Sequence, residues 1–229
     1  MAVFGPAWVE YTDKIAHFWK TRIAKEDLVL LPGDISWAMR IEEADADLRW
    51  IDALPGTKLL LRGNHDYWWS SNAKMQKTLP PTIHFIHNNS FTWGDVAIGG
   101  SRLWDTPEYN FQAFVEFRDN PRAKPPAPVK KEEEEKIFLR ELDRLRLSLS
   151  QLDPRAKIKI AMTHYPPIGA DLQPSRASQI LEEFGISICV FGHLHNLKKE
   201  CLPLFGTARG IRYELTSCDV IDFMPVKII

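Results

Sequence analysis

Four short apolar segments in this chain each end in a cluster of polar residues, and this repeated arrangement constrains the fold more than any other feature. The segments are 28–31, 58–61, 157–162 and 186–191, and each has the length and composition of a buried strand. Segments with helical periodicity lie between them, as in 8–24, where apolar residues recur every three or four positions. Alternation of this kind predicts a layered α/β domain.

The remaining elements fit the same architecture. We expect helices over 41–54, 71–79, 131–152 and 175–184, and strands over 83–86, 91–98, 213–221 and 226–229. The strand over 91–98 contains a possible turn at its Gly-Asp pair. Residues 105–130 contain five prolines, so we expect an irregular excursion or lid there and not a domain boundary. The 229 residues suffice for one well-cored domain, and we predict a single domain over 1–229.

Bulk composition excludes several classes of protein. The formal net charge is −1, so no overall basic field would attract a long nucleic acid, and we expect none as partner. No apolar run approaches the ~20 residues that span a bilayer, and the first residues lack the features of a signal peptide. The three cysteines form no Cys-x-x-Cys pair and are interpreted as free thiols in a reducing compartment. We therefore predict a cytoplasmic protein without a membrane partner.

The polar clusters at the four strand ends are where we expect chemistry. They are Gly33-Asp34, Gly63-Asn64-His65-Asp66, Thr163-His164 and Gly192-His193-Leu194-His195. In an open α/β sheet the carboxyl ends of the strands form the edge that bears ligand sites. A carboxylate, an amide oxygen and three imidazoles are therefore expected to converge there, and the glycines allow the sharp turns that this requires.

Taken in this order, the four clusters resemble the motifs of calcineurin-like metallophosphoesterases. The resemblance covers 28–195, most of the chain. It implies a four-layer αββα sandwich of the metallo-dependent phosphatase type. It also implies a hydrolase that cleaves a phosphate mono- or diester by attack of a metal-bound hydroxide, with a phosphorylated small molecule or a phosphoprotein as substrate. The oligomeric state is not predicted.

The resemblance also implies a metal site. Two divalent ions are expected, and oxygen and imidazole ligands without a thiolate suit Mn, Fe or Zn. Asp34 would bridge the two metals. Asn64, His164 and His193 would complete the second metal site, and His195 would belong to the first.

The same resemblance assigns three catalytic residues. His65 would stabilise developing charge or protonate the leaving oxygen, and Asp66 would hold the other nitrogen of its ring. Arg62 would contact the phosphate through a forked pair of hydrogen bonds. Tyr67 and the two tryptophans after it are expected to pack in the core or to form a wall of the substrate cleft.

One part of the family pattern is missing. The pattern begins with a strand that ends in Asp-x-His, and this chain contains no Asp-x-His. We therefore expect the first strand to be missing or reduced to residues 2–4, and the first metal to keep only Asp34 and His195. We also expect the natural start to lie upstream of Met1.

Each motif alone has a simpler interpretation. Gly33-Asp34 would serve as an ordinary turn, His164 as a satisfied loop histidine, and Arg62 as an ion-pair partner of Asp66. For the whole chain, the alternative to an enzyme is a degenerate, non-catalytic family member that binds a metal or a partner.

Overall fold

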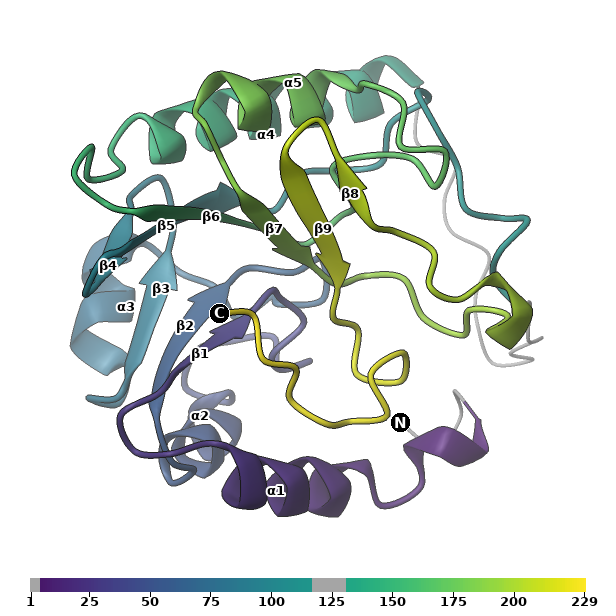
Figure 1. Cartoon of the computed structure of the whole chain (residues 1–229). Coiled ribbons are helices and arrows are strands. Elements are labelled where there is room, and N and C mark those ends of the chain that lie inside the picture. Colours follow the sequence, from purple (N-terminus) through teal and green to yellow (C-terminus); the bar gives the residue numbers. More distant parts are fainter. Residues whose placement is uncertain (1–4, 117–130) are drawn as a thin grey trace.

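Two β-sheets face each other at the centre of the molecule (Figure 1). The structure is a computed structural model that describes residues 5–116 and 131–229. The smaller sheet is parallel, with the order β1 (Leu28–Leu31), β2 (Thr57–Leu61), β3 (Ile83–Ile86). The larger sheet has the order β4 (Phe91–Trp93), β5 (Val96–Ser101), β6 (Ile158–Thr163), β7 (Ile188–Phe191), β9 (Ile211–Leu215), β8 (Thr207–Ala208). Its four central strands are parallel, and β4 and β8 are antiparallel edges.

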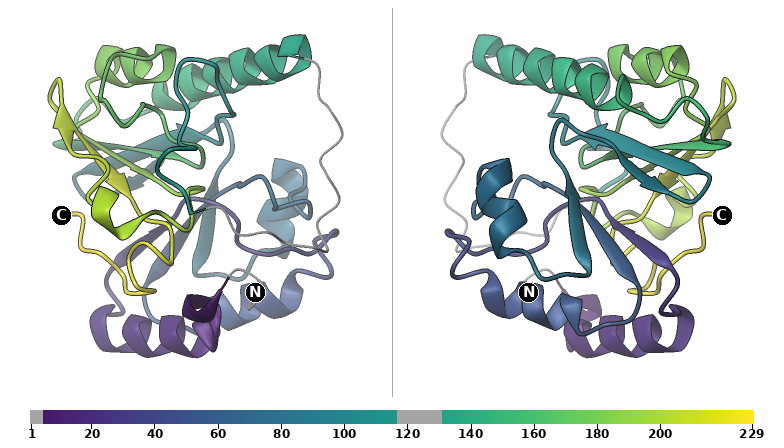
Figure 2. Two further views of the ribbon diagram at one scale, coloured as in Figure 1. Left: turned by 90° about the vertical axis from the view of Figure 1, so that its right-hand side faces the viewer. Right: turned by 90° about the vertical axis from the view of Figure 1, so that its left-hand side faces the viewer.

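Helices cover the outer faces of both sheets (Figures 1 and 2). The larger sheet is covered by α4 (Lys131–Leu149) and α5 (Arg176–Glu183), and the smaller sheet lies next to α1 (Tyr11–Arg22), α2 (Asp45–Asp52) and α3 (Asn72–Thr78). Two short 3₁₀ turns, Pro6–Trp8 and Lys199–Cys201, complete the described elements. The order of the layers is helix, sheet, sheet, helix, which confirms the predicted αββα sandwich.

Three apolar cores lie between these layers, and successive residues of a strand face different cores. In β2, Leu59 and Leu61 face the core between the sheets, while Leu60 faces the core beneath α2 and α3. In β7, Ile188 and Val190 enter the same central core, and the two residues that alternate with them face α4 and α5. Because successive strand residues point to opposite faces, the wholly apolar segments noted in the sequence are what a strand covered on both sides requires.

Several predicted bounds were wrong. The first helix begins at Tyr11, because Pro6–Trp8 forms a separate 3₁₀ turn, and the helix expected over 41–54 is regular only from Asp45. The segment 91–98 is a hairpin, and the turn that the sequence indicated at its Gly-Asp pair is confirmed. The strand expected over 213–221 ends at Leu215, and 226–229 forms no strand despite its β-branched residues, because it pairs with no described strand.

The predicted proline-rich excursion is described only in part. Residues 105–116 are irregular and contain one isolated bridge, between Val115 and Leu197. Its remaining residues, 117–130, lie outside the described residues, as does the segment 2–4 that we considered as a reduced first strand. Among the described residues, no helix is long and apolar enough to span a membrane. All three cysteines are free, as predicted.

The edge of the smaller sheet borders a large groove. Among the described residues β1 pairs only with β2, and its four apolar residues are partly exposed. A groove of about 1480 Å³ runs along this edge between α1 and the C-terminal segment 216–229. Its wall includes Leu30, Ile160 and Val190 from the inner faces of the sheets, and it extends to Asp34 and His195. The edge of β1 therefore borders a groove that reaches these two predicted site residues.

Candidate metal centre

The polar clusters converge because the strands that precede them are parallel. The loops after β1 and β2 leave the smaller sheet, and the loops after β6 and β7 leave the larger one. Direct contacts join the two sets. The ring Nδ1 of His164, after β6, lies 2.9 Å from the carbonyl oxygen of Pro32, after β1. The site therefore lies where the carboxyl edges of the two sheets meet.

Asp66 fixes the two loops of the smaller sheet. Its buried carboxylate accepts hydrogen bonds from the backbone amides of Asp34, Ile35, Ser36 and Gly63, at 2.7–3.0 Å, and from the indole of Trp68 at 2.9 Å. Burial raises the pKa of Asp66, and the bonds from Gly63, Ser36 and Trp68 oppose that shift. The prediction that Asp66 holds the ring of His65 is therefore wrong, since both carboxylate oxygens bind the loop backbone.

Two glycines allow these loops to touch. A Cβ atom on Gly33 would lie 2.5 Å from His164 Nδ1, and one on Gly63 would lie 2.1 Å from Asp34 Oδ1. Asp34 and His193 adopt positive φ angles, 57° and 71°, which non-glycine residues rarely do. Strained backbone at two of the predicted metal ligands is typical of functional sites, where the surrounding contacts hold a residue in place.

Four donor atoms gather in one cluster. His164 Nε2 lies 2.6 Å from Asn64 Oδ1, 3.3 Å from His193 Nδ1 and 3.5 Å from Asp34 Oδ2, and His193 Nδ1 lies 3.1 Å from Asn64 Oδ1. Ligands bound to one metal at about 2.0–2.2 Å lie roughly 2.8–3.6 Å apart. Three of these four distances fall in that range and the fourth is slightly shorter. The structure therefore brings together the four residues predicted for the second metal.

In His164, Nδ1 carries the ring proton and Nε2 carries none. A carbonyl oxygen only accepts, so Nδ1 must donate to Pro32. Burial lowers the pKa of His164 to about 3, and burial followed by the neighbouring His164 lowers that of His193 to about 3. His164 is therefore neutral near pH 7, and Nε2 presents a lone pair to the amide oxygen of Asn64. His193 Nδ1 supplies at most one proton to these two acceptors.

Two acceptor atoms that share at most one proton repel each other, and this shortage of protons tests whether a cation fits the cluster. A divalent ion would accept the lone pairs of the two rings and of Asn64, and a ligating histidine typically donates its other N–H to a backbone carbonyl, as His164 does. Within the described residues, no group of three or more His, Cys, Asp or Glu side chains is placed to hold a metal without further help. The amide oxygen of Asn64 is therefore essential to this donor set, and with it the residues fit a divalent metal.

His195 lies apart from this cluster, with a support of its own. Its Nδ1 lies 2.6 Å from Oδ1 of Asp219, whose other oxygen accepts from the backbone amide of Asn196 at 2.7 Å. Burial alone would raise the pKa of Asp219, but the hydrogen bond and charge of His195 outweigh it and the pKa is lowered. His195 Nδ1 therefore donates to a carboxylate, and its Nε2 is available as a ligand on the side of the large groove.

His65 stands at the rim of the site. Its backbone amide donates to Asp34 Oδ1 at 2.9 Å, and its ring stacks on Trp37, with centroids 4.4 Å apart and an angle of 12° between the planes. Tyr67 contacts the other side of the ring edge-on at 6.3 Å. Aromatic contacts, and not Asp66, therefore orient the imidazole. The tryptophans that follow Tyr67 pack in the core as expected.

Arg62 and Arg102 place positive charge behind the cluster. The Nε atoms of both are buried and have no hydrogen-bond partner. Burial lowers the pKa of Arg102; the carboxylate of Glu141 opposes that shift, while the charge of Arg62 adds to it. Glu141 lies 3.7 Å from Arg102 but forms its shorter ion pair, at 2.7 Å, with Arg144. The alternative that Arg62 pairs with Asp66 does not hold, since other donors occupy that carboxylate.

Sequence reasoning missed Asp219. Asp219 follows β9 by four residues, in a loop like those that carry the other site residues, but the strand predicted over 213–221 concealed that loop. The rule that polar residues after parallel strands converge would have found Asp219, had the end of this strand been placed correctly. Arg102, which follows β5 directly, was considered from the sequence as a residue that could reach the cleft, but it was not predicted as a site residue.

Comparison with known proteins identifies the family of this chain. A family model described as calcineurin-like phosphoesterase matches residues 8–197. Two solved structures are similar at low identity: a protein of unknown function, AQ665, from Aquifex aeolicus (13% identity, TM-score 0.47, 96% of this chain and 82% of that one) and TT1561 from Thermus thermophilus (12% identity, TM-score 0.49, 92% and 84%). A search of curated proteins found no match. The chain belongs to the calcineurin-like phosphoesterase family.

Proposed function

We propose that the protein is a metal-dependent phosphohydrolase that cleaves a phosphate mono- or diester. The observation that carries this proposal is the cluster in which His164 Nε2 and Asn64 Oδ1, both hydrogen-bond acceptors, face each other at 2.6 Å beside His193 and Asp34. Family membership supports phosphoester hydrolysis at the level of the reaction.

Two divalent ions, Mn, Fe or Zn, suit the available ligands. Asn64, His164 and His193 would hold one ion with Asp34, and Asp34 would share a second ion with His195. When bound, such ions polarise phosphoryl oxygens and lower the pKa of coordinated water. The chain's own contribution is to hold the two imidazoles in place, through Pro32 for His164 and Asp219 for His195.

The other residues act on the phosphate ester. Arg62 and Arg102 supply unpaired guanidinium N–H groups, and the local excess of positive charge favours a phosphate over a neutral ligand. His65, whose ring stacks on Trp37, would give a proton to the leaving oxygen. Asp66 positions both loops through their backbone amides, so its role is indirect.

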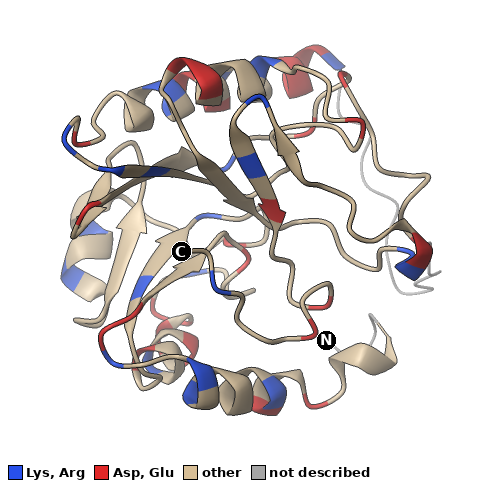
Figure 3. Ribbon diagram, in the orientation of Figure 1, with Lys and Arg blue, Asp and Glu red and all other residues tan. Residues whose placement is uncertain are grey.

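We further propose a phosphorylated small molecule or a phosphoprotein as the substrate. Basic and acidic residues are interleaved on the outer helices in Figure 3, and the formal net charge of the chain is −1. A long nucleic acid is favoured by a continuous basic surface, because it binds through many phosphates at once. The mixed surface favours a ligand with one or few phosphates.

Hydrolysis of aryl phosphates tests this function. With manganese present, the protein should release 4-nitrophenol from 4-nitrophenyl phosphate, from bis(4-nitrophenyl) phosphate, or from both, and a chelator should stop the reaction. Asp34→Asn should lower kcat/KM at least 100-fold. Asp95→Asn is the matched control, because Asp95 pairs with Lys157 on the surface. No turnover with Mn, Fe or Zn, or full activity of Asp34→Asn, would overturn the proposal.

A non-catalytic role is the second candidate, and the exposed side of the site favours it. Asp34 and His195 are the two residues that would hold the first metal, and both lie beside the large groove. Metal analysis separates the two candidates. One tightly bound ion without turnover indicates a binding protein, and two ions with turnover indicate the enzyme.

A further inference from the structure

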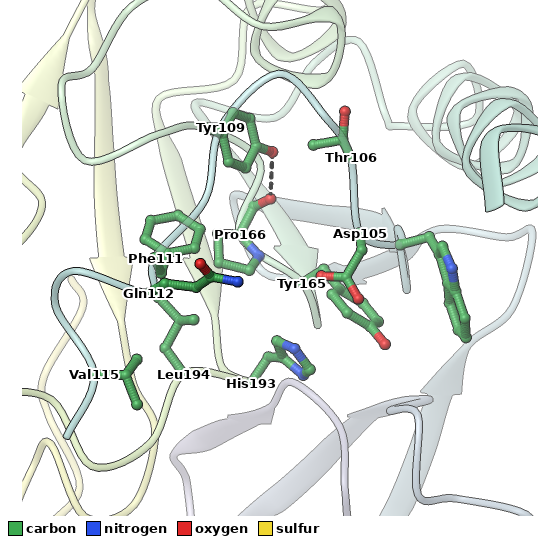
Figure 4. Close-up of a pocket in the computed structure, with 11 residues that line it drawn as sticks. Asp105, Thr106, Tyr109, Phe111, Gln112, Val115, Tyr165, Pro166, His193 and Leu194 are labelled. Carbon is green, nitrogen blue, oxygen red and sulfur yellow. Dashed lines mark hydrogen bonds between the residues drawn. The ribbon is translucent and has the colours of Figure 1, made fainter. Parts of the chain in front are cut away.

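A second, smaller pocket adjoins the candidate metal centre at His193, which also lines the groove. It has a volume of about 210 Å³, and His193 forms part of its wall (Figure 4). Tyr109 and Phe111 line it from the segment after β5, and Tyr165 and Pro166 from the loop after β6. The residue whose ring nitrogen lies 3.1 Å from Asn64 Oδ1 therefore also borders this pocket.

The pocket is lined chiefly by rings. Tyr165 packs on His193 with centroids 4.0 Å apart, and Tyr109 and Phe111 contact each other at 5.7 Å. Trp104 lies 5.3 Å from Tyr165 and also lines the pocket. Aromatic walls of this kind favour another ring, which packs against their faces and edges, over an alcohol whose hydroxyl groups would lose their water.

Hydrogen bonds hold the irregular wall of the pocket in place. The hydroxyl of Tyr109 donates to the carbonyl of Pro166 at 2.7 Å (Figure 4). The bridge between Val115 and Leu197 is flanked by backbone bonds from Glu116 to Asn196 and from Lys198 to Phe114, at 2.8 and 2.9 Å. The pocket is therefore anchored at both ends and exists before any ligand binds.

From this arrangement we propose that the pocket binds an uncharged aromatic ring of the phosphate ester. The proposal rests on the proposed function, because it assumes that the phosphate binds at the neighbouring metal centre. An apolar cavity of about 150 Å³ accepts benzene, so 210 Å³ is adequate for one substituted ring. The preferred substrates are thus aryl phosphates or esters that carry a ring next to the phosphate.

Phosphonates test the proposal without hydrolysis. Titration calorimetry on the manganese-loaded full chain compares phenylphosphonate with methylphosphonate, which has the same head group but no ring, and with cyclohexylphosphonate, which has a ring that is not flat. We expect phenylphosphonate to bind at least tenfold more tightly than methylphosphonate and about threefold more tightly than cyclohexylphosphonate. Equal affinities for phenyl and methyl, or for phenyl and cyclohexyl, would overturn the aromatic pocket.

A blocking variant locates the ring. Gln112 is an exposed residue at the pocket in Figure 4, and Gln112→Trp should fill the pocket and remove the phenyl advantage while methylphosphonate binding persists. Leu147→Trp, which adds an exposed indole on α4, is the control and should keep the advantage. A full phenyl advantage in Gln112→Trp contradicts the assignment. If neither phosphonate binds the wild-type protein, the proposed function itself falls, and this pocket assignment falls with it.

Discussion

The two sides of the candidate metal centre are built differently. On one side, His164 is 1% exposed and lies within hydrogen-bond distance of Pro32 and Asn64. On the other, the side chain of His195 is 35% exposed, has Asp219 as its partner and borders a groove of about 1480 Å³. We call these the enclosed side and the groove side.

The difference shows how the fold prepares a ligand set. On the enclosed side, loops from both sheets fix the donors before a metal arrives, so little conformational entropy remains to be lost. On the groove side, β1 is the edge strand of its sheet among the described residues, and the side chain of His195 is partly exposed. We therefore expect the enclosed side to bind a metal first and more tightly, and the groove side to bind weakly.

The largest effect should come from the enclosed side. His164→Gln should lower the affinity for the manganese ion of the enclosed side more than 100-fold, about 2.7 kcal/mol or more, because it removes a fixed imidazole ligand. His195→Gln should leave that affinity within threefold and weaken only a second, lower-affinity ion. Titration calorimetry of metal-free protein measures both, with the exposed His84→Gln as control. Equal losses from the two variants would remove the distinction between the sides.

The same contrast should extend to the stability of the smaller sheet. Leu60 is fully buried, and Leu60→Ala should cost about 2–5 kcal/mol of unfolding free energy. Leu30, in the groove wall, is only half-buried, so Leu30→Ala should cost about 1 kcal/mol. Denaturant unfolding measures both values. A loss at Leu30 as large as that at Leu60 would mean that the edge of β1 is covered in solution.

A smaller effect should follow from the support of His195. Asp219→Asn should weaken the groove-side metal by about 10–100-fold, because the imidazole loses the carboxylate that orients it. The enclosed-side metal should be unaffected. Calorimetry with the control Asp222→Asn, a nearby exchange of the same kind, checks this. Weakening of both metals to the same degree would show that Asp219 acts on the whole fold and not on His195.

The last expected effect is a pH dependence of stability. The folded-state pKa of His164 is about 3, below the 6.5 of an unfolded histidine. The unfolded chain therefore takes up a proton first as pH falls, so stability is complete above about 6.5 and declines toward 3. Between pH 7.5 and 5.5 this one group should cost about 1.4 kcal/mol. Denaturant unfolding of the metal-free protein should show the decline, and His164→Gln should reduce it; an equal slope in both proteins would contradict this origin.

Sequence patterns predicted the fold where burial on both faces dictated composition. The alternation of Leu59, Leu60 and Leu61 between two cores requires an unbroken apolar strand, and the strand was visible for that reason. The C-terminal segment 226–229 has a similar aliphatic composition, yet it forms no strand. Composition alone does not supply a neighbouring strand, so prediction was wrong where pairing decided the outcome.

The candidate site was predictable as a set of ligands but not as a network. Asp34, Asn64, His164 and His193 were recognised from their places after strands, and the structure brings them together. The role of Asp66 was not predictable, because it depends on backbone amides from a loop 30 residues away. Contacts between loops that lie far apart in the chain have no signature in local sequence.

The central claim is that Asn64, His164 and His193 bind one divalent metal together with Asp34. Crystals of the protein soaked in manganese, with an anomalous difference map, test this most directly. We predict a peak at about 2.0–2.3 Å from Asn64 Oδ1, His164 Nε2 and a ring nitrogen of His193. A map without a peak among these atoms, or with manganese bound only elsewhere, would contradict the account.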